Sequence, residues 1–148
     1  MNNVVLLTHG EFSKGIAQSC EFILGKVDSL KALSISMDTS MLQAEKMLEE
    51  TICSYGEAPV IIITDIAAGS TTQAGLQVLT RYKNVYLVSG LNLGLLTELL
   101  LTELPDNREE CLKILREIVQ QARETITLVN DLADGEPEAE LPEEDGEL

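Results

Sequence analysis

The chain has 148 residues, the length of a single domain, and its net charge of −15 argues against nucleic acid or an anionic membrane surface as a partner. Much of that charge lies at the end. Residues 134–148 hold eight of the 25 acids and no base, which leaves 17 acids and 10 bases, or −7, for residues 1–133. Hydrophobic residues make up 45% of the chain but aromatic residues only 3%, which predicts an aliphatic core of buried parallel strands and helices.

The first predicted strand ends in the only histidine of the sequence. Residues 4–7 are four consecutive aliphatic residues, which is typical of a buried strand, and Thr8, His9 and Gly10 follow them. In open α/β sheets, ligands bind beyond the carboxyl ends of the strands, so His9 is the first candidate for chemistry. A lone histidine is more often a structural residue, and its position alone does not assign it a role.

The next segments predict a β-α-β unit. Helical spacing of apolar residues begins near Ser13, a possible N-cap, and stops at Gly25. Residues 32–36 alternate between apolar and polar, as a half-buried or edge strand does. A second helix follows, for which either Thr39 or Ser40 can be the N-cap.

The most clearly predicted strand covers residues 60–65 and ends in Asp65. Its four β-branched aliphatic residues indicate burial on both faces. The loop over residues 66–72 is rich in small residues and leads into a helix. Small residues allow the backbone to approach a bound anion, and a helix N-terminus offers unpaired N–H groups to it.

Residues 85–88 predict a fourth strand, which is followed by Ser89 and Asn92 and by two further helices. The segment over residues 125–129 fits either a continued helix or a strand, and its β-branched residues favour a short last strand. We therefore predict a domain over residues 1–130. Residues 131–148 are predicted to be an acidic, disordered tail.

The three cysteines fall on the apolar sides of predicted helices and lack the spacing of metal ligands, so we expect buried thiols in a reducing cytoplasm. We expect neither a metal nor a cofactor. The N-terminus lacks the basic flank and the long apolar region of a signal peptide. The most apolar stretch, over residues 91–104, is too short to span a bilayer, which favours a cytoplasmic protein.

Four alternating strand-helix units predict an α/β fold with a doubly wound, mainly parallel four-stranded sheet and helices on both faces. In that fold the ends of the strands meet at one edge. If the first and third strands are adjacent, His9 and Asp65 can form a hydrogen bond.

The chemistry that these residues favour is phosphoryl transfer through phosphohistidine. A carboxylate on one imidazole nitrogen fixes the tautomer and leaves the lone pair of the other nitrogen free to act as a nucleophile. The amides of Gly69 and Ser70 and the Ser70 hydroxyl could stabilise an incoming anion. No serine or cysteine elbow motif and no phosphate-loop lysine motif competes with this interpretation.

Three stretches in matching order resemble the IIA component of the mannose-type bacterial phosphotransferase system. They are Thr8-His9-Gly10-x-Phe12-x-x-Gly15, Asp65 before Ala68-Gly69-Ser70, and Val88-Ser89-Gly90-Leu91-Asn92-Leu93. The resemblance extends over residues 3–130. Together the three stretches are far more specific than any one of them.

The resemblance implies a cytoplasmic carrier that takes a phosphoryl group from the phosphocarrier protein HPr and passes it to a IIB component. The IIB component then phosphorylates a sugar during uptake by a IIC/IID membrane permease. By the same resemblance, His9 is the phosphorylated residue, Asp65 orients it, and Gly10, Gly69 and Ser70 contact the phosphoryl group. The family also implies a homodimer, in which residues 125–129 would supply the strand that pairs with the sheet of the other copy.

Two departures from the family pattern concern the loop after Asp65 and the end of the chain. The family loop usually reads Asp-x-x-Gly-Gly-Ser-Pro, whereas here Ala68 replaces the first glycine and Thr71 replaces the proline. Some relatives continue through a linker into a IIB domain, whereas this sequence ends in acidic residues. We therefore expect its IIB partner to be a separate polypeptide.

Other classes of protein fit less well. A response-regulator receiver needs an acidic pair after its first strand, which Thr8 and His9 do not supply, and a flavin site needs stacking aromatic residues, of which only Phe12 lies near the predicted site. A IIA-like domain that regulates sugar metabolism without a transport role stays open as an alternative.

Overall fold

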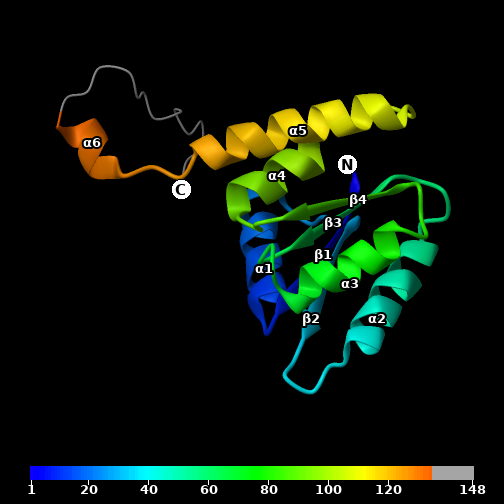
Figure 1. Cartoon of the computed structure of the whole chain (residues 1–148). Helices are drawn as coiled ribbons and strands as arrows, with labels where there is room; N and C mark the ends of the chain where they lie inside the picture. Colours follow the sequence, from blue (N-terminus) through cyan, green and yellow to red (C-terminus); the bar gives the residue numbers. More distant parts are fainter. Residues whose placement is uncertain (135–148) are drawn as a thin grey trace.

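The computed structural model describes residues 1–134, which form a parallel sheet covered by helices on both faces (Figure 1). All strand pairs are parallel, and the spatial order is β2-β1-β3-β4. The strands are β1 (Asn3–His9), β2 (Leu30–Ile35), β3 (Val60–Thr64) and β4 (Val85–Ser89). The prediction of a doubly wound α/β fold is confirmed, and β1 and β3 are adjacent.

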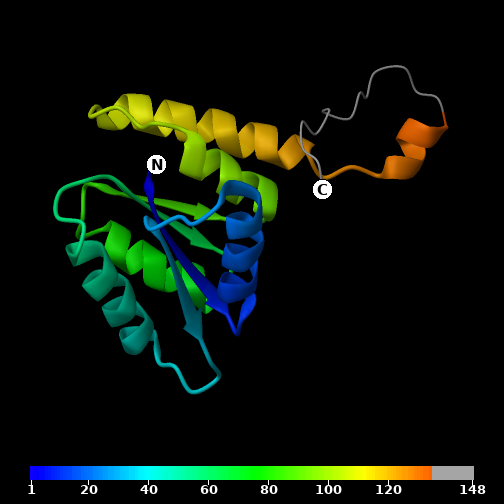
Figure 2. The same cartoon turned by 180° about the vertical axis from the view of Figure 1, so that it is seen from behind.

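The helices form two layers, as the views from the two sides show (Figures 1 and 2). One layer packs α2 and α3 on the sheet, and the other packs α1, α4 and α5 on the opposite face. The helices are α1 (Phe12–Leu24), α2 (Met41–Cys53), α3 (Ser70–Leu79), α4 (Leu93–Leu101), α5 (Arg108–Glu124) and α6 (Val129–Ala133). Among residues 1–134, no helix has both the length and the apolar character that crossing a membrane requires.

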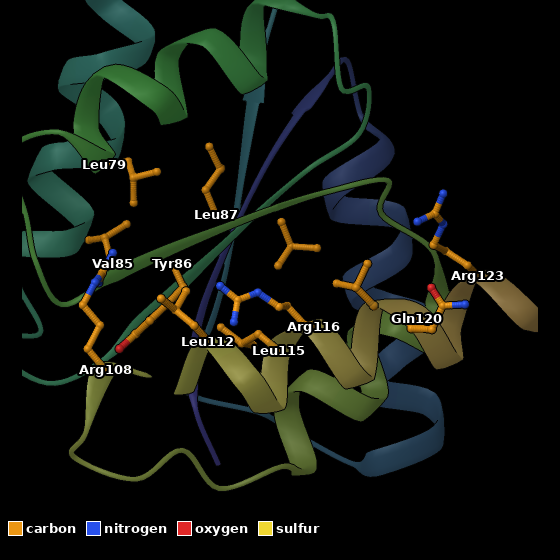
Figure 3. A pocket seen from close by; sticks show the side chains of 12 residues that line it. Leu79, Val85, Tyr86, Leu87, Arg108, Leu112, Leu115, Arg116, Gln120 and Arg123 are labelled. Atoms are coloured by element: carbon orange, nitrogen blue, oxygen red, sulfur yellow. The ribbon is translucent and has the colours of Figure 1, made fainter. Parts of the chain in front are cut away.

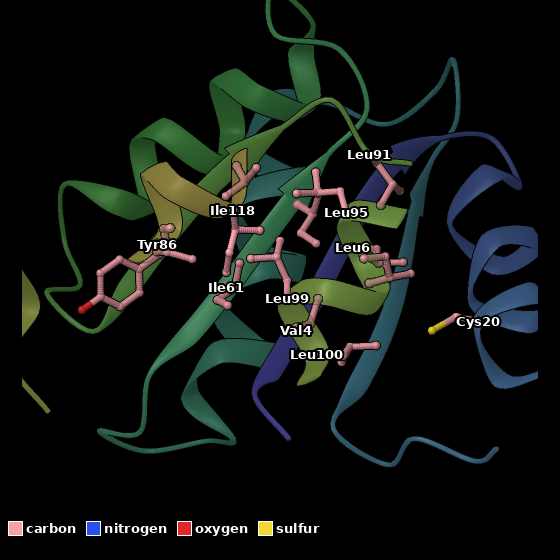
Figure 4. Close-up of a cluster of buried hydrophobic side chains, with 14 of the residues drawn as sticks. Val4, Leu6, Cys20, Ile61, Tyr86, Leu91, Leu95, Leu99, Leu100 and Ile118 are labelled. Carbon is pink, nitrogen blue, oxygen red and sulfur yellow. The ribbon is translucent and has the colours of Figure 1, made fainter. Parts of the chain in front are cut away.

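The central strands divide their side chains between two aliphatic cores because successive side chains of a strand point to opposite faces. In β1, Val4 and Leu6 belong to the core beneath α1, α4 and α5, part of which Figure 4 shows, while Val5 and Leu7 belong to the core beneath α2 and α3. All four side chains are fully buried. This double burial explains why the strand reads as a continuous aliphatic run.

Helix starts agree only in part with the sequence-based expectations. Ser40 is the N-cap of α2 and forms a capping box with Gln43, as one of the two alternatives predicted. Ser13 is not an N-cap, because α1 begins one residue earlier, at Phe12. The Ser13 N–H instead donates to the Thr8 hydroxyl across 2.8 Å, so the end of β1 supplies the acceptor.

Two further expectations concern residues 125–129 and Cys53. The strand over residues 125–129 is not formed by the single chain, in which α5 ends at Glu124 and α6 begins at Val129, and its exchange in a dimer stays a prediction. A strand requires a neighbour for its backbone, whereas Ile126 and Leu128 of the single chain point largely to solvent. The expectation of a buried thiol at Cys53 is wrong, because Cys53 is exposed at the end of α2, unlike Cys20 and Cys111. The predicted disordered tail over residues 131–148 begins inside α6, which ends at Ala133, and residues 135–148 lie outside the described residues. The proposed domain boundary after residue 130 stays a prediction.

Candidate functional site

The candidate site lies where β1 and β3 end side by side. Leu7 of β1 is opposite Thr64 of β3, so His9 and Asp65 follow at the same edge of the sheet. His9 Nδ1 is 2.9 Å from Asp65 Oδ2, and the backbone N–H of His9 donates to that same oxygen across 2.9 Å. The predicted contact between the two residues is confirmed.

This contact decides which imidazole nitrogen is available. An ionised carboxylate only accepts hydrogen bonds, so His9 Nδ1 carries the proton and donates to Asp65. In the neutral ring, Nε2 then has the free lone pair. The His9 side chain is 45% exposed, and its Nε2 is 3.3 Å from the Ser70 hydroxyl. The pair therefore presents a nucleophilic nitrogen toward solvent.

Asp65 is held through both carboxylate oxygens. Oδ2 accepts the two hydrogen bonds from His9, while Oδ1 accepts the Ile66 N–H across 3.1 Å and the Thr71 hydroxyl across 2.8 Å. Partial burial raises the pKa of Asp65, but the hydrogen bonds from His9, Thr71 and the local backbone outweigh it and hold that pKa below its ordinary value. Asp65 is therefore ionised at neutral pH.

Gly69 brings the backbone against the imidazole ring. A Cβ atom at this position would lie 3.2 Å from His9 Cε1 and 3.2 Å from the carbonyl oxygen of Ile66, which is tighter than ordinary contact. Gly69 is also the N-cap of α3, which no side chain caps. The N-terminal N–H groups of α3 thus face the site without a side-chain acceptor, as in many anion-binding sites.

Ser70 is the first residue of α3 rather than its N-cap, so its side chain is not needed to cap the helix. Gly10 turns the chain directly after His9 with a φ of +59°, a conformation that favours glycine. Its N–H donates to the carbonyl of Ile35 across 2.9 Å. The expected contact of Gly10 with a phosphoryl group stays a prediction.

Thr71 and Thr72, which follow Ser70, hold the loop through hydrogen bonds that the sequence did not predict. Thr71 bonds the Asp65 carboxylate. The Thr72 hydroxyl donates to the carbonyl of Ile66 across 2.7 Å and lies 2.6 Å from the Thr64 hydroxyl. In the sequence, Thr71 and Thr72 stand out only as hydroxyl residues six positions after Asp65 and Ile66. The loop geometry is needed to show that they bond to these two residues.

Ser89 and Asn92 serve the structure around the site. The side chain of Asn92 accepts the Leu95 N–H across 2.9 Å and caps α4. Ser89 lies 3.3 Å from the Thr72 hydroxyl. Neither residue contacts His9 among the interactions of the described residues, so both act on the loop and helix beside the site.

A well-defined cavity lies elsewhere, between β4 and α5 (Figure 3). It measures about 440 Å³, and its lining includes Tyr86, Leu115 and Arg116 but neither His9 nor Asp65. The histidine site is instead an open surface at the edge of the sheet. Such a surface is accessible to another protein.

A comparison with protein families gives a match to the model described as the PTS system fructose IIA component, over residues 3–116. The chain belongs to this family. Membership indicates a IIA role in a sugar phosphotransferase system (PTS) and confirms the resemblance stated from the sequence motifs. Among curated proteins, none matches the sequence.

Solved structures of similar proteins agree with the fold. A Klebsiella pneumoniae protein assigned provisionally as a phosphoenolpyruvate-dependent sugar PTS permease is 29% identical, with a TM-score of 0.72, over 89% of this chain and 93% of the other. The PTS IIA protein associated with the fucose utilization operon of Streptococcus pneumoniae is 23% identical, with a TM-score of 0.76, over 89% and 96%. The mannose/sorbose-specific IIA subunit from Enterococcus faecalis is 22% identical, with a TM-score of 0.73, over 86% and 96%.

Proposed function

We propose that this IIA protein is a phosphoryl carrier that accepts a phosphoryl group from phospho-HPr on His9 and passes it to a IIB component during sugar uptake. The observation that carries the proposal is the 2.9 Å contact between His9 Nδ1 and Asp65, which leaves Nε2 unprotonated at an exposed edge. Family membership supports the same role. The protein would act in the cytoplasm, where HPr and a IIB component meet the inner side of a IIC/IID permease.

The transfer step follows from the tautomer. The Nε2 lone pair of His9 attacks the phosphorus atom, a P–N bond forms, and the bond from phosphorus to the donor breaks, so that its electron pair leaves with the donor. The His9 ring becomes an imidazolium with its Nδ1 proton retained. The Asp65 carboxylate, 2.9 Å away, stabilises that positive charge. Transfer to IIB reverses these steps with IIB as the acceptor.

The loop after Asp65 would hold the transferred oxygens. Ser70 Oγ lies 3.3 Å from His9 Nε2, which is close to where a phosphoryl group on that nitrogen would sit. The uncapped N-terminus of α3 adds backbone N–H donors and a positive dipole end. Gly69 leaves room for the ring and the phosphoryl group because it has no side chain. Gly10 is included as a third contact on the strength of the resemblance.

Homodimer formation is part of the proposal. β4 is an edge strand of the sheet, and Ile126 and Leu128 expose apolar side chains just beyond α5. In a dimer, residues 125–129 of one copy would add to the sheet of the other, which would bury these side chains and pair the free edge. Sedimentation equilibrium should give a dimer for the wild-type chain and a monomer for an Ile126→Asp, Leu128→Asp double variant. A wild-type monomer at high micromolar concentration would contradict this part.

The transfer is tested with phosphoenolpyruvate, enzyme I, HPr and the purified chain. We expect one acid-labile, base-stable phosphate per chain, and His9→Ala should remove it. Asp28→Asn is a suitable control, because Asp28 pairs with Lys26 on the surface before β2, at the opposite edge of the sheet. A label that persists in His9→Ala would contradict the proposal.

Addition of candidate IIB proteins distinguishes transport from regulation. Loss of the label from this chain and its appearance on a IIB component encoded beside IIC and IID genes supports the transport role. A chain that is phosphorylated but passes the group to none of them would favour the regulatory alternative.

A further inference from the structure

We propose that Thr71 is a positioning residue for phosphoryl transfer, whose hydroxyl fixes the Asp65 carboxylate so that Oδ2 faces the His9 ring. The proposal rests on the proposed phosphoryl-carrier function for its kinetic consequence. Its geometric basis is independent of that function, because it concerns contacts of the unphosphorylated chain.

The contacts of Asp65 separate into two pairs. His9 supplies both donors to Oδ2, whereas Ile66 N–H and Thr71 Oγ1 supply both donors to Oδ1. Of the two contacts to Oδ1, the one from Thr71 is the shorter, at 2.8 Å against 3.1 Å. A rotation of the carboxylate about its Cβ–Cγ bond would weaken the contacts of both oxygens at once. Thr71 therefore opposes the rotation that would turn Oδ2 away from His9.

Burial makes the Thr71 hydroxyl hard to replace. Thr71 is fully buried, and within the described residues its hydroxyl has Asp65 Oδ1 as its hydrogen-bond partner. A buried carboxylate oxygen that loses a donor is left less well solvated, which costs more than the loss of a surface hydrogen bond. Thr72, by contrast, donates to the Ile66 carbonyl and so holds the loop backbone. Thr71 therefore holds the Asp65 carboxylate, whereas Thr72 holds the loop backbone.

The position of Thr71 also explains how this chain differs from the family pattern noted in the sequence. Thr71 lies in the first turn of α3, where a helix does not need the residue's N–H as an intrahelical donor. A proline is tolerated there, but it brings no hydroxyl and restricts the preceding residue, Ser70. The hydroxyl in this chain therefore adds a donor to Asp65 that a proline at the same position lacks.

The experiment compares Thr71→Val, which removes the hydroxyl and keeps the shape, with Thr71→Ser, which restores a hydroxyl. Thr51→Val is the matched control, because the Thr51 hydroxyl donates to the Met47 carbonyl within α2. In the unphosphorylated protein, carboxyl ¹³C NMR should report a higher Asp65 pKa in Thr71→Val than in the wild type, with recovery in Thr71→Ser and no change in Thr51→Val.

The kinetic arm measures transfer from phospho-HPr. The Thr71–Asp65 hydrogen bond exists both before and during the reaction, so it lowers the activation barrier only by the amount by which it strengthens in the transition state. We therefore expect kcat to fall about 3- to 10-fold in Thr71→Val, with little change in KM for HPr. Thr71→Ser should recover most of the rate. If Thr71→Val does not fold, Thr71→Ala provides a smaller variant that also lacks the hydroxyl.

The outcomes separate this proposal from the proposed function. A wild-type Asp65 titration and a wild-type rate in folded Thr71→Val would overturn the role of Thr71 while leaving the carrier function intact. A wild-type chain that takes no phosphate from HPr would overturn the carrier function and the kinetic role of Thr71. The NMR titration would then still decide whether Thr71 controls the Asp65 carboxylate.

Discussion

Asp65 Oδ2 binds His9 twice, through the Nδ1 atom of the ring and through the backbone N–H, each across 2.9 Å. The backbone contact fixes the carboxylate relative to the end of β1, and the ring contact fixes the imidazole relative to the carboxylate. The two contacts together determine where His9 Nε2 points. The catalytic proposal therefore depends on this pair more than on any other contact.

Asp65→Asn should leave the fold intact and slow phosphoryl transfer by roughly 10²- to 10⁴-fold, because the amide removes the charge that stabilises the imidazolium. Rapid-quench measurement of transfer from phospho-HPr gives the rate, and circular dichroism confirms folding. Asp28→Asn makes the same chemical change at an exposed ion pair with Lys26 and should retain the wild-type rate. An Asp65→Asn rate equal to that of Asp28→Asn would remove Asp65 from the site.

Gly69→Ala should slow transfer by about one order of magnitude or more, because the new Cβ lies 3.2 Å from His9 Cε1 and presses on the ring. Gly15→Ala is the matched control. A Cβ at Gly15, inside α1, has nothing within 4 Å and should stabilise the helix by about 0.5–1 kcal/mol without affecting transfer. Wild-type transfer in Gly69→Ala would show that the loop can move away from the ring at no cost.

Ser70→Ala should lower the transfer rate but not the stability, whereas Ser40→Ala should lower the stability but not the transfer rate. Ser70 Oγ lies 3.3 Å from His9 Nε2 and does not cap α3, so its removal should slow transfer about 3- to 10-fold with little change in thermal stability. Ser40 caps α2, so its removal should cost about 1 kcal/mol and leave transfer unchanged. Thermal melts and transfer rates of both variants check this, and a large loss of stability in Ser70→Ala would point to a structural role instead.

Asp65 should also contribute to acid stability. Because its pKa is lower in the folded chain than its ordinary value of 3.8, the unfolded chain binds the proton more readily, and folding gains stability from Asp65 above that value. This contribution is lost as the pH falls through the lower, folded-state pKa. Denaturant titrations should show that the difference in unfolding free energy between wild type and Asp65→Asn shrinks as the pH falls below about 4. A difference that grows as the pH falls below about 4 would contradict the sign of the shift.

The sheet can be predicted from the sequence because its central strands have a clear residue pattern. The aliphatic runs of β1 and β3 are buried on both faces, and their polar ends place His9 and Asp65 at one edge, so periodicity and one topological rule suffice. The segment over residues 125–129 forms no strand in the single chain, because β-branched residues favour a strand only where a neighbouring strand exists. Propensity alone contains no information about that neighbour.

The details of the site depend on contacts across the loop that no periodic pattern contains. Gly69 and Ser70 were found from their residue types, but the assignment of Gly69 rather than Ser70 as the N-cap requires the backbone geometry. Thr71 was visible only as a departure from a family pattern. Its bond to Asp65 depends on how the chain turns between the two residues, which side-chain chemistry alone does not determine.

In the proposed phosphorylated state, His9 Nε2 carries the phosphoryl group while Nδ1 stays hydrogen-bonded to Asp65. ¹⁵N and ³¹P NMR of the ¹⁵N-labelled chain, phosphorylated by phospho-HPr, tests it directly. Since the chain has one histidine, the ring signals are unambiguous. We expect phosphorus coupling to Nε2 and a proton retained on Nδ1. Coupling to Nδ1, or a phosphorylated chain with an unmodified histidine ring, would contradict it.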